Sequence, residues 1–481
     1  MEWLSGRDYW LARVVIERGL GLVYLLAFAN ALQQFPALLG EHGLLPATRF
    51  LRGVRFPDAP SLFHLGYSDR LLRTFAWIGV ALSLAIMLGV PQAGPLWVPM
   101  LAWLLLWVLY LSIVNVGQRF YSFGWESLLL EAGFLAVFLG NARTAPPWLV
   151  ILLFRWLALR VELGAGLIKL RGDSCWRDLT CMEYHHETQP MPNPLSWYFH
   201  RLPRGLHRIE VLGNYVAQLV APFALFLPQP IAAIGALVMI GTQAYLLTSG
   251  NYAWLNLLTM VISFSGIPDS LGVELLRGIA PAAVEQPPVW FAVAVFALTG
   301  VIVGLSYWPV RNLLGTRQLM NYSFNRYHLV NAYGAFGRVT RERYEIVLEG
   351  TAAGELTEQT AWSEYEFRGK PGDPRRRPPQ VAPYHLRLDW LMWFAALSPR
   401  YGEQWFMPLV ERLLAGDRAV LRLFRRNPFP DAPPSWIRAR FYRYRFTTGR
   451  ERRASHAWWA REPAGEYLAP VRLPTPTARP R

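Results

Sequence analysis

Long apolar blocks fill the first 308 residues. They lie near 12–33, 71–90, 95–116, 124–140, 147–170, 209–227, 229–248, 250–268 and 288–308. A mostly apolar run of roughly 18 to 25 residues is long enough to cross a bilayer core of about 30 Å. Trp and Tyr gather at the block ends, as amphipathic rings do at the headgroup level. The pattern predicts a polytopic α-helical membrane domain over residues 1–308, with about eight or nine spans.

The first block has some features of a cleavable signal peptide. Arg7, Arg13 and Arg18 precede an apolar run, and residues 29–31 resemble a small-x-small cleavage site. The charged leader is long, however, it contains Glu17, and further apolar blocks follow it. These features favour an uncleaved membrane anchor.

The chain changes character after the last apolar block. Residues 1–308 hold 19 basic and 17 acidic residues, a net charge of +2, and residues 309–481 hold 29 and 16, a net charge of +13. A basic region of this kind is either a solvated surface or a binding face for an anionic partner. We expect no nucleic-acid partner.

The second part has the patterns of a mixed domain. Residues 343–351 and 437–448 alternate with period two and predict strands, whereas 387–398 and 403–426 have helical spacing. Residues 370–379 are rich in Pro and predict an exposed loop. We therefore predict a linker at 309–334, a soluble α+β, β-rich domain at 335–470 and a disordered tail at 471–481.

Ionisable residues lie inside several apolar blocks. Such groups are costly in a bilayer unless they pair or face a polar cavity. Arg13 and Glu17 share a helical face, and Glu131 could meet Arg155 or Arg160 on a neighbouring helix. The residues form either structural pairs between helices or the wall of a functional cavity. The expected intramembrane polar cluster comprises Arg13, Glu17, Glu126, Glu131, Arg155, Arg160 and Glu162.

The only two cysteines, Cys175 and Cys181, lie in the segment GDSCWRDLTCMEYHHETQPMPNP at 172–194. His185 and His186 follow them, but the spacing is not that of a zinc site, and HETQ lacks the second histidine of HExxH. We expect no metal. The cysteines form either a short disulfide loop or two reduced, packed side chains.

Two long phrases carry a family resemblance. NVGQRFYSFGWESLLLEAGFLAVFLG at 115–140 and the 172–203 segment resemble the lipase maturation factor family of polytopic membrane proteins. In the second part, NAYGAFGRVTRERYEIVLEG and NPFPDAPPSWIRARFYRYRF are similar to the same family's C-terminal domain. The resemblance runs through most of the chain in collinear order.

The resemblance implies a membrane-embedded folding factor for secreted, lipase-like clients, without catalytic residues or a cofactor. It implies the endoplasmic reticulum membrane, or the inner membrane for a bacterial homologue. The surfaces expected to bind the client are the 172–203 loop, residues 362–394 and the strand at 437–448. Their leading aromatic residues are Trp176, Tyr184, Trp362, Trp390, Tyr442 and Tyr444.

An alternative function is that of a membrane enzyme. The helical part also looks distantly like the membrane part of vitamin K-dependent carboxylase, and charged residues in the spans could serve proton or quinone chemistry. Intramembrane charge often marks function, so this alternative makes the polar cluster a reaction site.

Overall fold

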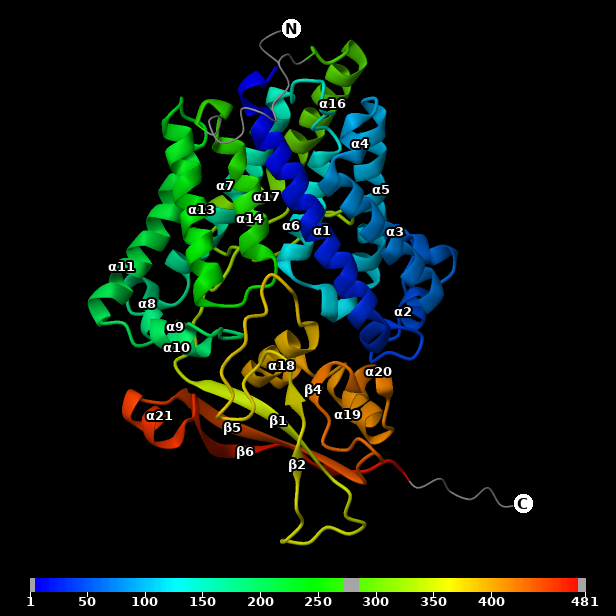
Figure 1. Ribbon diagram of the computed structural model, residues 1–481, viewed down its shortest axis with the longest axis vertical. Helices are drawn as coiled ribbons and strands as arrows, with labels where there is room; N and C mark the ends of the chain where they lie inside the picture. Colours follow the sequence, from blue (N-terminus) through cyan, green and yellow to red (C-terminus); the bar gives the residue numbers. More distant parts are fainter. Residues whose placement is uncertain (1–4, 272–284, 475–481) are drawn as a thin grey trace.

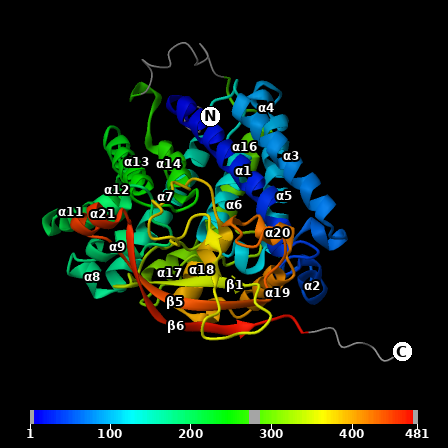
Figure 2. The ribbon, with the colours of Figure 1, turned by 60° about the horizontal axis from the view of Figure 1, so that its bottom comes forward.

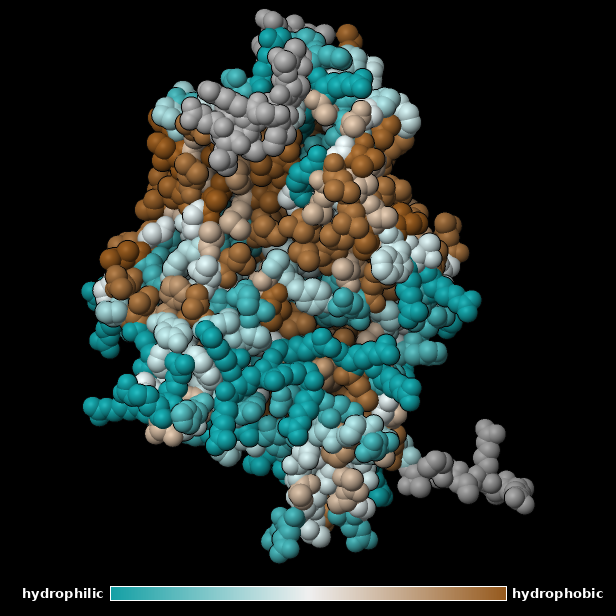
Figure 3. Space-filling model, in the orientation of Figure 1, coloured by the Kyte–Doolittle hydropathy of each residue, from teal (hydrophilic) through white to brown (hydrophobic). Residues whose placement is uncertain are grey.

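A computed structural model describes residues 5–271 and 285–474. The helical half occupies the upper part of Figure 1, and a C-terminal half built around a β-sheet lies below it. On the face that Figure 3 shows, hydrophobic residues cover much of the helical half, whereas hydrophilic residues dominate the C-terminal half. This division agrees with the composition of the two parts of the sequence.

The helical half is built from long helices joined by short ones. Its helices are α1 (Trp10–Leu39), α2 (Ala47–Gly53), α3 (Asp69–Leu88), α4 (Val90–Ala93), α5 (Trp97–Val116), α6 (Gly124–Ala136), α7 (Trp148–Arg171), α8 (Ser174–Arg177), α9 (Met182–Thr188), α10 (Ser196–Phe199), α11 (Arg204–Tyr215), α12 (Ala221–Ala224), α13 (Ile231–Ser249), α14 (Leu255–Ser263), α16 (Val289–Leu305) and α17 (Tyr307–Leu314). Local chemistry sets several ends. In α3, for example, the Ser68 hydroxyl accepts from the Leu71 N–H, and Gly89 ends the helix with a φ of +82°.

Four helical segments in the described residues are long and apolar enough to cross a membrane: α3, α5, α13 and Val289–Leu314. The expected count of eight or nine spans is therefore not confirmed. The other apolar blocks become shorter or more polar elements. α6 has 13 residues and α14 has 9, and a π-helical turn at Val216–Val220 separates α11 from α12.

Two long helices that carry charged residues, α1 and α7, are largely buried in the bundle. α1 contacts α3, α5, α6 and α14, and α7 contacts α6, α12, α14 and α16. Ile16, Leu20 and Tyr24 of α1 are fully buried. Because these helices are surrounded by protein, their charged side chains meet protein groups rather than lipid.

The C-terminal half is organised on an antiparallel sheet with the strand order β2-β1-β5-β6. The strands are β1 (Arg343–Thr351), β2 (Ser363–Glu364), β5 (Trp436–Phe446) and β6 (Trp459–Val471); β3 (Glu366–Phe367) pairs with β4 (Phe424–Arg426) separately. The helices are α18 (Arg387–Leu397), α19 (Phe406–Leu414), α20 (Arg418–Leu421) and α21 (Gly449–Ser455). Figure 2 shows β1, β5 and β6 side by side.

Strand β5 buries opposite faces at its two ends. Ile437 and Ala439 belong to the main core with residues of α18 and α19. Tyr444 and Phe446 instead pack with Trp459 and Trp197 in a separate core cluster. The sheet is therefore covered on both sides, and Tyr442 and Tyr444 of β5 are buried in this packing.

The predicted strands at 343–351 and 437–448 are confirmed by β1 and β5, and the helix at 387–398 by α18. The single helix expected at 403–426 is wrong, because Gly416 and the Asp417 cap divide it into α19 and α20 before β4 begins. Of the expected tail, residues 471–474 follow or end β6, and 475–481 lie outside the described residues.

Candidate functional site

A buried ion pair joins the two halves. Arg387, the first residue of α18, donates from Nη1 to Glu126 Oε1 of α6 at 2.7 Å, and both side chains have zero exposure. The same nitrogen donates to the Phe120 carbonyl at 2.8 Å, and Nε donates to Asn30 Oδ1 at 2.8 Å. The guanidinium lies 3.4 Å from the Tyr121 ring centre. Arg387 therefore fixes α18 against both α1 and α6.

The segment just before α18, which contains His385, is bound to the same part of the helical half. Asn30 and Gln34 of α1 donate to the His385 carbonyl, at 2.5 and 2.7 Å. The His385 ring is fully buried and accepts a 3.4 Å hydrogen bond from Trp125 Nε1. Burial and the neighbouring Arg387 charge lower the pKa of His385 to about 3. The imidazole is thus neutral at physiological pH.

A second buried carboxylate, that of Glu131, accepts hydrogen bonds from three residues. Arg160 of α7 forms a two-nitrogen contact with it. Asn331 donates from its backbone at 3.0 Å and from its side chain at 2.9 Å, and the Tyr333 hydroxyl donates at 2.7 Å. The prediction that Glu131 meets Arg160 is confirmed. Asn331 and Tyr333 belong to the predicted 309–334 linker, part of which enters the helical half.

The remaining predicted polar residues do not gather into one cluster. Arg13 donates to the Thr144 carbonyl at 2.6 Å, and Arg155 donates to the carbonyls of Leu225 and Ser265. In the described residues, no ion pair within 4 Å joins Arg13 to Glu17, and Glu17 Oε1 has no hydrogen-bond partner. The residues form several separate contacts between helices, which favours the structural interpretation for most of them.

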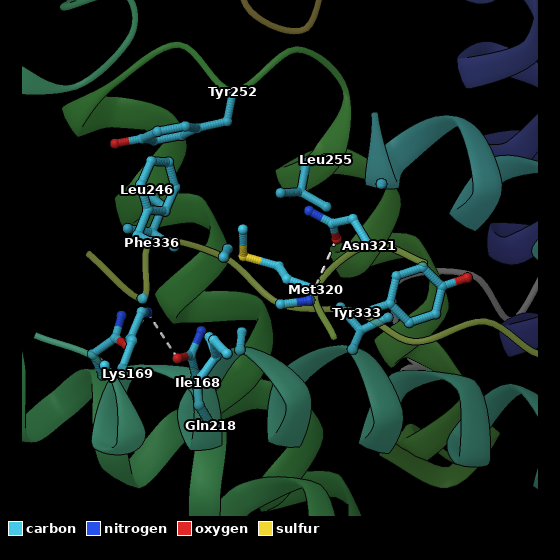
Figure 4. A pocket seen from close by; sticks show the side chains of 18 of the residues that line it. Ile168, Lys169, Gln218, Leu246, Tyr252, Leu255, Met320, Asn321, Tyr333 and Phe336 are labelled. Atoms are coloured by element: carbon cyan, nitrogen blue, oxygen red, sulfur yellow. Dashed lines mark hydrogen bonds between the residues drawn. The ribbon is translucent and has the colours of Figure 1, made fainter. Parts of the chain in front are cut away.

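A cavity of about 960 Å³ lies beside these contacts. Its wall combines α7, α11, α13 and α14 with residues 316–338 and with α18 from the C-terminal half. Figure 4 shows Tyr252, Leu246, Phe336, Met320 and Leu255 around the hollow, so most of its surface is apolar or aromatic. Tyr333, which donates to Glu131, also lines it.

Polar groups occupy one part of the cavity wall. Lys169 donates to Gln218 at 2.8 Å (Figure 4). It also donates to Asn214 at 2.7 Å. Asn256 donates to Gln243, which donates to Glu162 Oε1 at 2.7 Å. In the described residues Glu162 has no ion-pair partner within 4 Å, and Glu162 Oε2 and Asn256 Oδ1 accept no hydrogen bond.

The 172–203 loop is hydrogen-bonded to the C-terminal half. Arg343 of β1 donates to the carbonyls of Glu187, Gln189 and Pro190 in this loop. In return, the Glu187 carboxylate accepts from the Phe446 N–H at 2.6 Å, and Trp197 Nε1 donates to the Thr447 carbonyl at 3.0 Å. The sheet therefore holds residues 187–197 of the loop, and Trp197 packs at the junction.

The structure joins Cys175 to Cys181 in a disulfide, with their Cα atoms 4.8 Å apart. His186, His207 and Glu210 form a separate group whose ligand atoms lie within 4.8 Å of one another. These residue types could hold a metal ion. The same contacts form a hydrogen-bonded network, since Glu210 meets His207 Nδ1 at 2.7 Å and His186 Nε2 at 3.3 Å and also accepts from Tyr245.

Four of the six aromatic residues expected to bind a client lie in the interior. The exposed fractions are 2% for Trp176, 3% for Trp390, 9% for Tyr442 and 1% for Tyr444. Burial removes them from direct contact with a partner, which corrects that expectation. Tyr184 and Trp362 are half-buried, beneath the guanidinium groups of Arg341 and Arg438 at 4.8 and 4.1 Å from the ring centres.

Two family models account for most of the chain. Residues 11–272 match the lipase maturation factor transmembrane domain, and residues 329–469 match the lipase maturation factor C-terminal domain. The chain belongs to the lipase maturation factor family. This member is an integral membrane protein, since the transmembrane-domain match agrees with the four apolar helices.

Named relatives extend over nearly the whole of this family member. Lipase maturation factor 1 of Bos taurus is 42% identical over 97% of this chain and 90% of the relative. Lipase maturation factor 1 of Homo sapiens is also 42% identical, over 97% and 88%. Lipase maturation factor 2 of Homo sapiens is 30% identical over 97% and 83%. No solved structure matches the chain.

Sequence reasoning missed the partners that come from the C-terminal part. Arg387 reaches Glu126 across 261 positions, and Asn331 reaches Glu131 across 200. The available signal for Arg387 was an arginine at the start of a helix whose only other charged residue is Asp389. Its burial means that the start of α18 belongs to the contact between the halves.

Proposed function

We propose that this chain is a membrane-embedded maturation factor that helps secreted client proteins such as lipases reach their assembled form. The observation that carries the proposal is the 42% identity to proteins named lipase maturation factor 1, over 97% of the chain. Both matched domains occur in the family order. By the same resemblance, its membrane is that of the endoplasmic reticulum, or the inner membrane for a bacterial homologue.

The proposed role is client binding without a catalysed reaction. Glu126 and Glu131, the carboxylates that the enzyme alternative would use, are occupied by Arg387 and by Arg160, Asn331 and Tyr333. Groups held by several fixed donors serve to hold helices together. Neither the family matches nor the named relatives support the carboxylase-like alternative.

The proposed client surface is the junction rim, which we define as Met320, Leu397 and Tyr401. These three residues line the mouth of the cavity and have exposed fractions of 48%, 43% and 47%. They lie where the two halves meet, outside the buried aromatic core of α18. Exposed apolar residues grouped at one place commonly mark an interaction site.

The proposal is tested in cells that lack their own maturation factor, by measuring the activity and the amount of a secreted lipase. We expect Leu397→Asp with Tyr401→Asp to lower the specific activity of the secreted lipase at unchanged abundance of the factor. Leu356→Asp is the matched control, because Leu356 is exposed in the loop between β1 and β2. Equal activity with the rim and control variants would reject the rim as the client surface.

Point substitutions are preferable to deletion of residues 335–470. Deletion would remove Arg387 from the buried Glu126 carboxylate and Arg343 from the 172–203 loop. A truncated chain would therefore lose stability as well as its client surface, and the two effects would be confounded.

A further inference from the structure

The cavity has a size and composition that the maturation role leaves unexplained. Its volume of about 960 Å³ is at the upper end of the range for small-molecule sites, which is roughly 300 to 1,000 Å³. A single water molecule occupies only about 30 Å³ of liquid. The wall is largely apolar, so a chain of waters would find few partners along most of it.

The polar part of the cavity wall is suited to a ligand that donates hydrogen bonds. Glu162 Oε1 accepts from the Gln243 amide, which turns the Gln243 oxygen toward Asn256 Nδ2. This order leaves two acceptors without a partner in the described residues, Glu162 Oε2 and Asn256 Oδ1. Both side chains are 1% exposed and both line the cavity. A hydroxyl or amine group could serve these acceptors, whereas a quinone carbonyl could not.

The cavity also reaches the outer face of the helical half. Among its lining residues, Ile209 and Gly213 of α11 and Gly241 of α13 are exposed. The same face of the 204–224 segment presents Leu206, Leu212, Val216, Val220 and Phe223, all exposed. A Cβ added at Gly213 or Gly241 would meet no atom within 4 Å. The opening between α11 and α13 is thus set in an apolar surface suited to lipid.

We propose that this cavity binds one membrane-derived amphiphile, with an apolar body among Leu246, Leu255 and Phe336 and a hydroxyl or amine head at Glu162 and Asn256. The ligand enters between α11 and α13. Because the wall includes α18, an occupied cavity would also stabilise the contact between the halves. This inference goes beyond the maturation role and does not require a particular client.

The test uses the full chain in lipid nanodiscs and a long-chain alcohol that carries a diazirine in its alkyl chain. Ultraviolet irradiation and peptide mapping locate the adduct. We expect adducts on cavity residues. We also expect an unlabelled long-chain alcohol or amine to compete with the probe about tenfold more strongly than the methyl ether of the same alcohol does. This difference corresponds to one hydrogen bond to a charged group, which the ether cannot donate. Comparing the alcohol with the amine distinguishes the two head groups.

Two variants separate the cavity from non-specific labelling. Gly241→Trp places a large ring at the opening, and Gly300→Trp on α16 is the matched control, since Gly300 is equally open and does not line the cavity. We expect Gly241→Trp to reduce cavity adducts about tenfold and Gly300→Trp to leave them unchanged. Glu162→Gln should weaken alcohol competition while the methyl ether is unaffected.

Several outcomes would overturn the proposal. These are equal competition by the alcohol and the ether, equal labelling of the two tryptophan variants, or adducts confined to the outer surface. A cavity that yields no adduct while the protein remains folded by size-exclusion chromatography would show that it holds water only. Loss of client maturation with normal labelling would reject the proposed function and leave the lipid site intact.

Discussion

Arg387 and Glu126 form a fully buried ion pair between α18 and α6, with Nη1 and Oε1 2.7 Å apart. One residue belongs to the C-terminal half and the other to the helical half. The pair is completed by Asn30, the Phe120 carbonyl and Tyr110, which donates to the other Glu126 oxygen. The two halves are therefore joined by specific chemistry as well as by apolar packing.

Arg387→Met should strongly destabilise the protein. Removal of one partner leaves the Glu126 carboxylate buried without its cation, which typically costs about 3 to 5 kcal/mol. The measurement is the apparent free energy of unfolding from denaturant titration in mixed micelles. The control is Arg443→Met, because Arg443 pairs with Glu342 at 2.8 Å while both are more than 40% exposed, and such a pair contributes about 0 to 1 kcal/mol.

The double variant Glu126→Leu with Arg387→Met tests whether the two residues act as a pair. Its destabilisation should be smaller than the sum of the two single effects, since neither charge is then left buried alone. Strict additivity would show that the two side chains act independently.

Tyr333→Phe should destabilise the protein by about 1.5 to 3 kcal/mol, the usual net value of one hydrogen bond to a charged group. The hydroxyl is one of several donors to Glu131, so the remaining contacts from Arg160 and Asn331 should keep the fold. Glu131→Arg should instead abolish folding, because it places two guanidinium groups together. Normal yield of Glu131→Arg would contradict the buried position of this carboxylate.

Alkylation of unreduced, denatured protein should label neither Cys175 nor Cys181, and reduction should expose both. The two cysteines are six positions apart, and closing so short a loop stabilises by about 2 kcal/mol in the chain-entropy model. We expect Cys175→Ser with Cys181→Ser to lower stability by that amount. Labelling of both thiols without reductant would show that the two cysteines are reduced.

Stability should fall as the pH drops from 6.5 toward 3, partly because of His385. Its pKa is lowered to about 3 by burial and the nearby Arg387 charge, whereas an unfolded histidine titrates near 6.5. Between these values the unfolded chain holds a proton that the folded chain lacks, which costs at most about 1.4 kcal/mol per pH unit.

The variant His385→Gln should flatten that slope, and His42→Gln should leave it unchanged, because His42 is exposed in the loop after α1. The measurement is the unfolding midpoint of each variant at intervals between pH 5 and 7, which gives the slope of stability against pH. An identical slope in His385→Gln and the wild type would show that other groups set the acid sensitivity.

Local patterns predicted the elements whose signals are local. β1 and β5 follow from period-two alternation and β-forming residues, and α18 from its bulky residues at helical spacing. β6 was missed because Pro463 and Gly465 interrupt its pattern; an edge strand tolerates both, and its ladder is irregular at several positions. The count of eight or nine spans is not confirmed, because hydropathy alone does not distinguish a lipid-facing helix from a buried one such as α6.

The candidate site depended on contacts that no local pattern contains. The polar residues of the spans could be listed from the sequence, and Glu131 with Arg160 could be paired across neighbouring helices. The partner of Glu126 could not, since Arg387 lies in the other half. Likewise, Trp176, Trp390, Tyr442 and Tyr444 were expected at a surface because aromatic residues suit both interfaces and cores, and only the fold decides between them.

The most direct test of the maturation role is site-specific photocrosslinking in native membranes. A photoreactive amino acid at Tyr401 samples the junction rim, and the same group at Leu356 samples an exposed site in the loop between β1 and β2. We predict that the Tyr401 position captures a secreted hydrolase during its synthesis and that the Leu356 position does not. Absence of any secreted protein from the Tyr401 adducts, with normal amounts of folded protein, would contradict it.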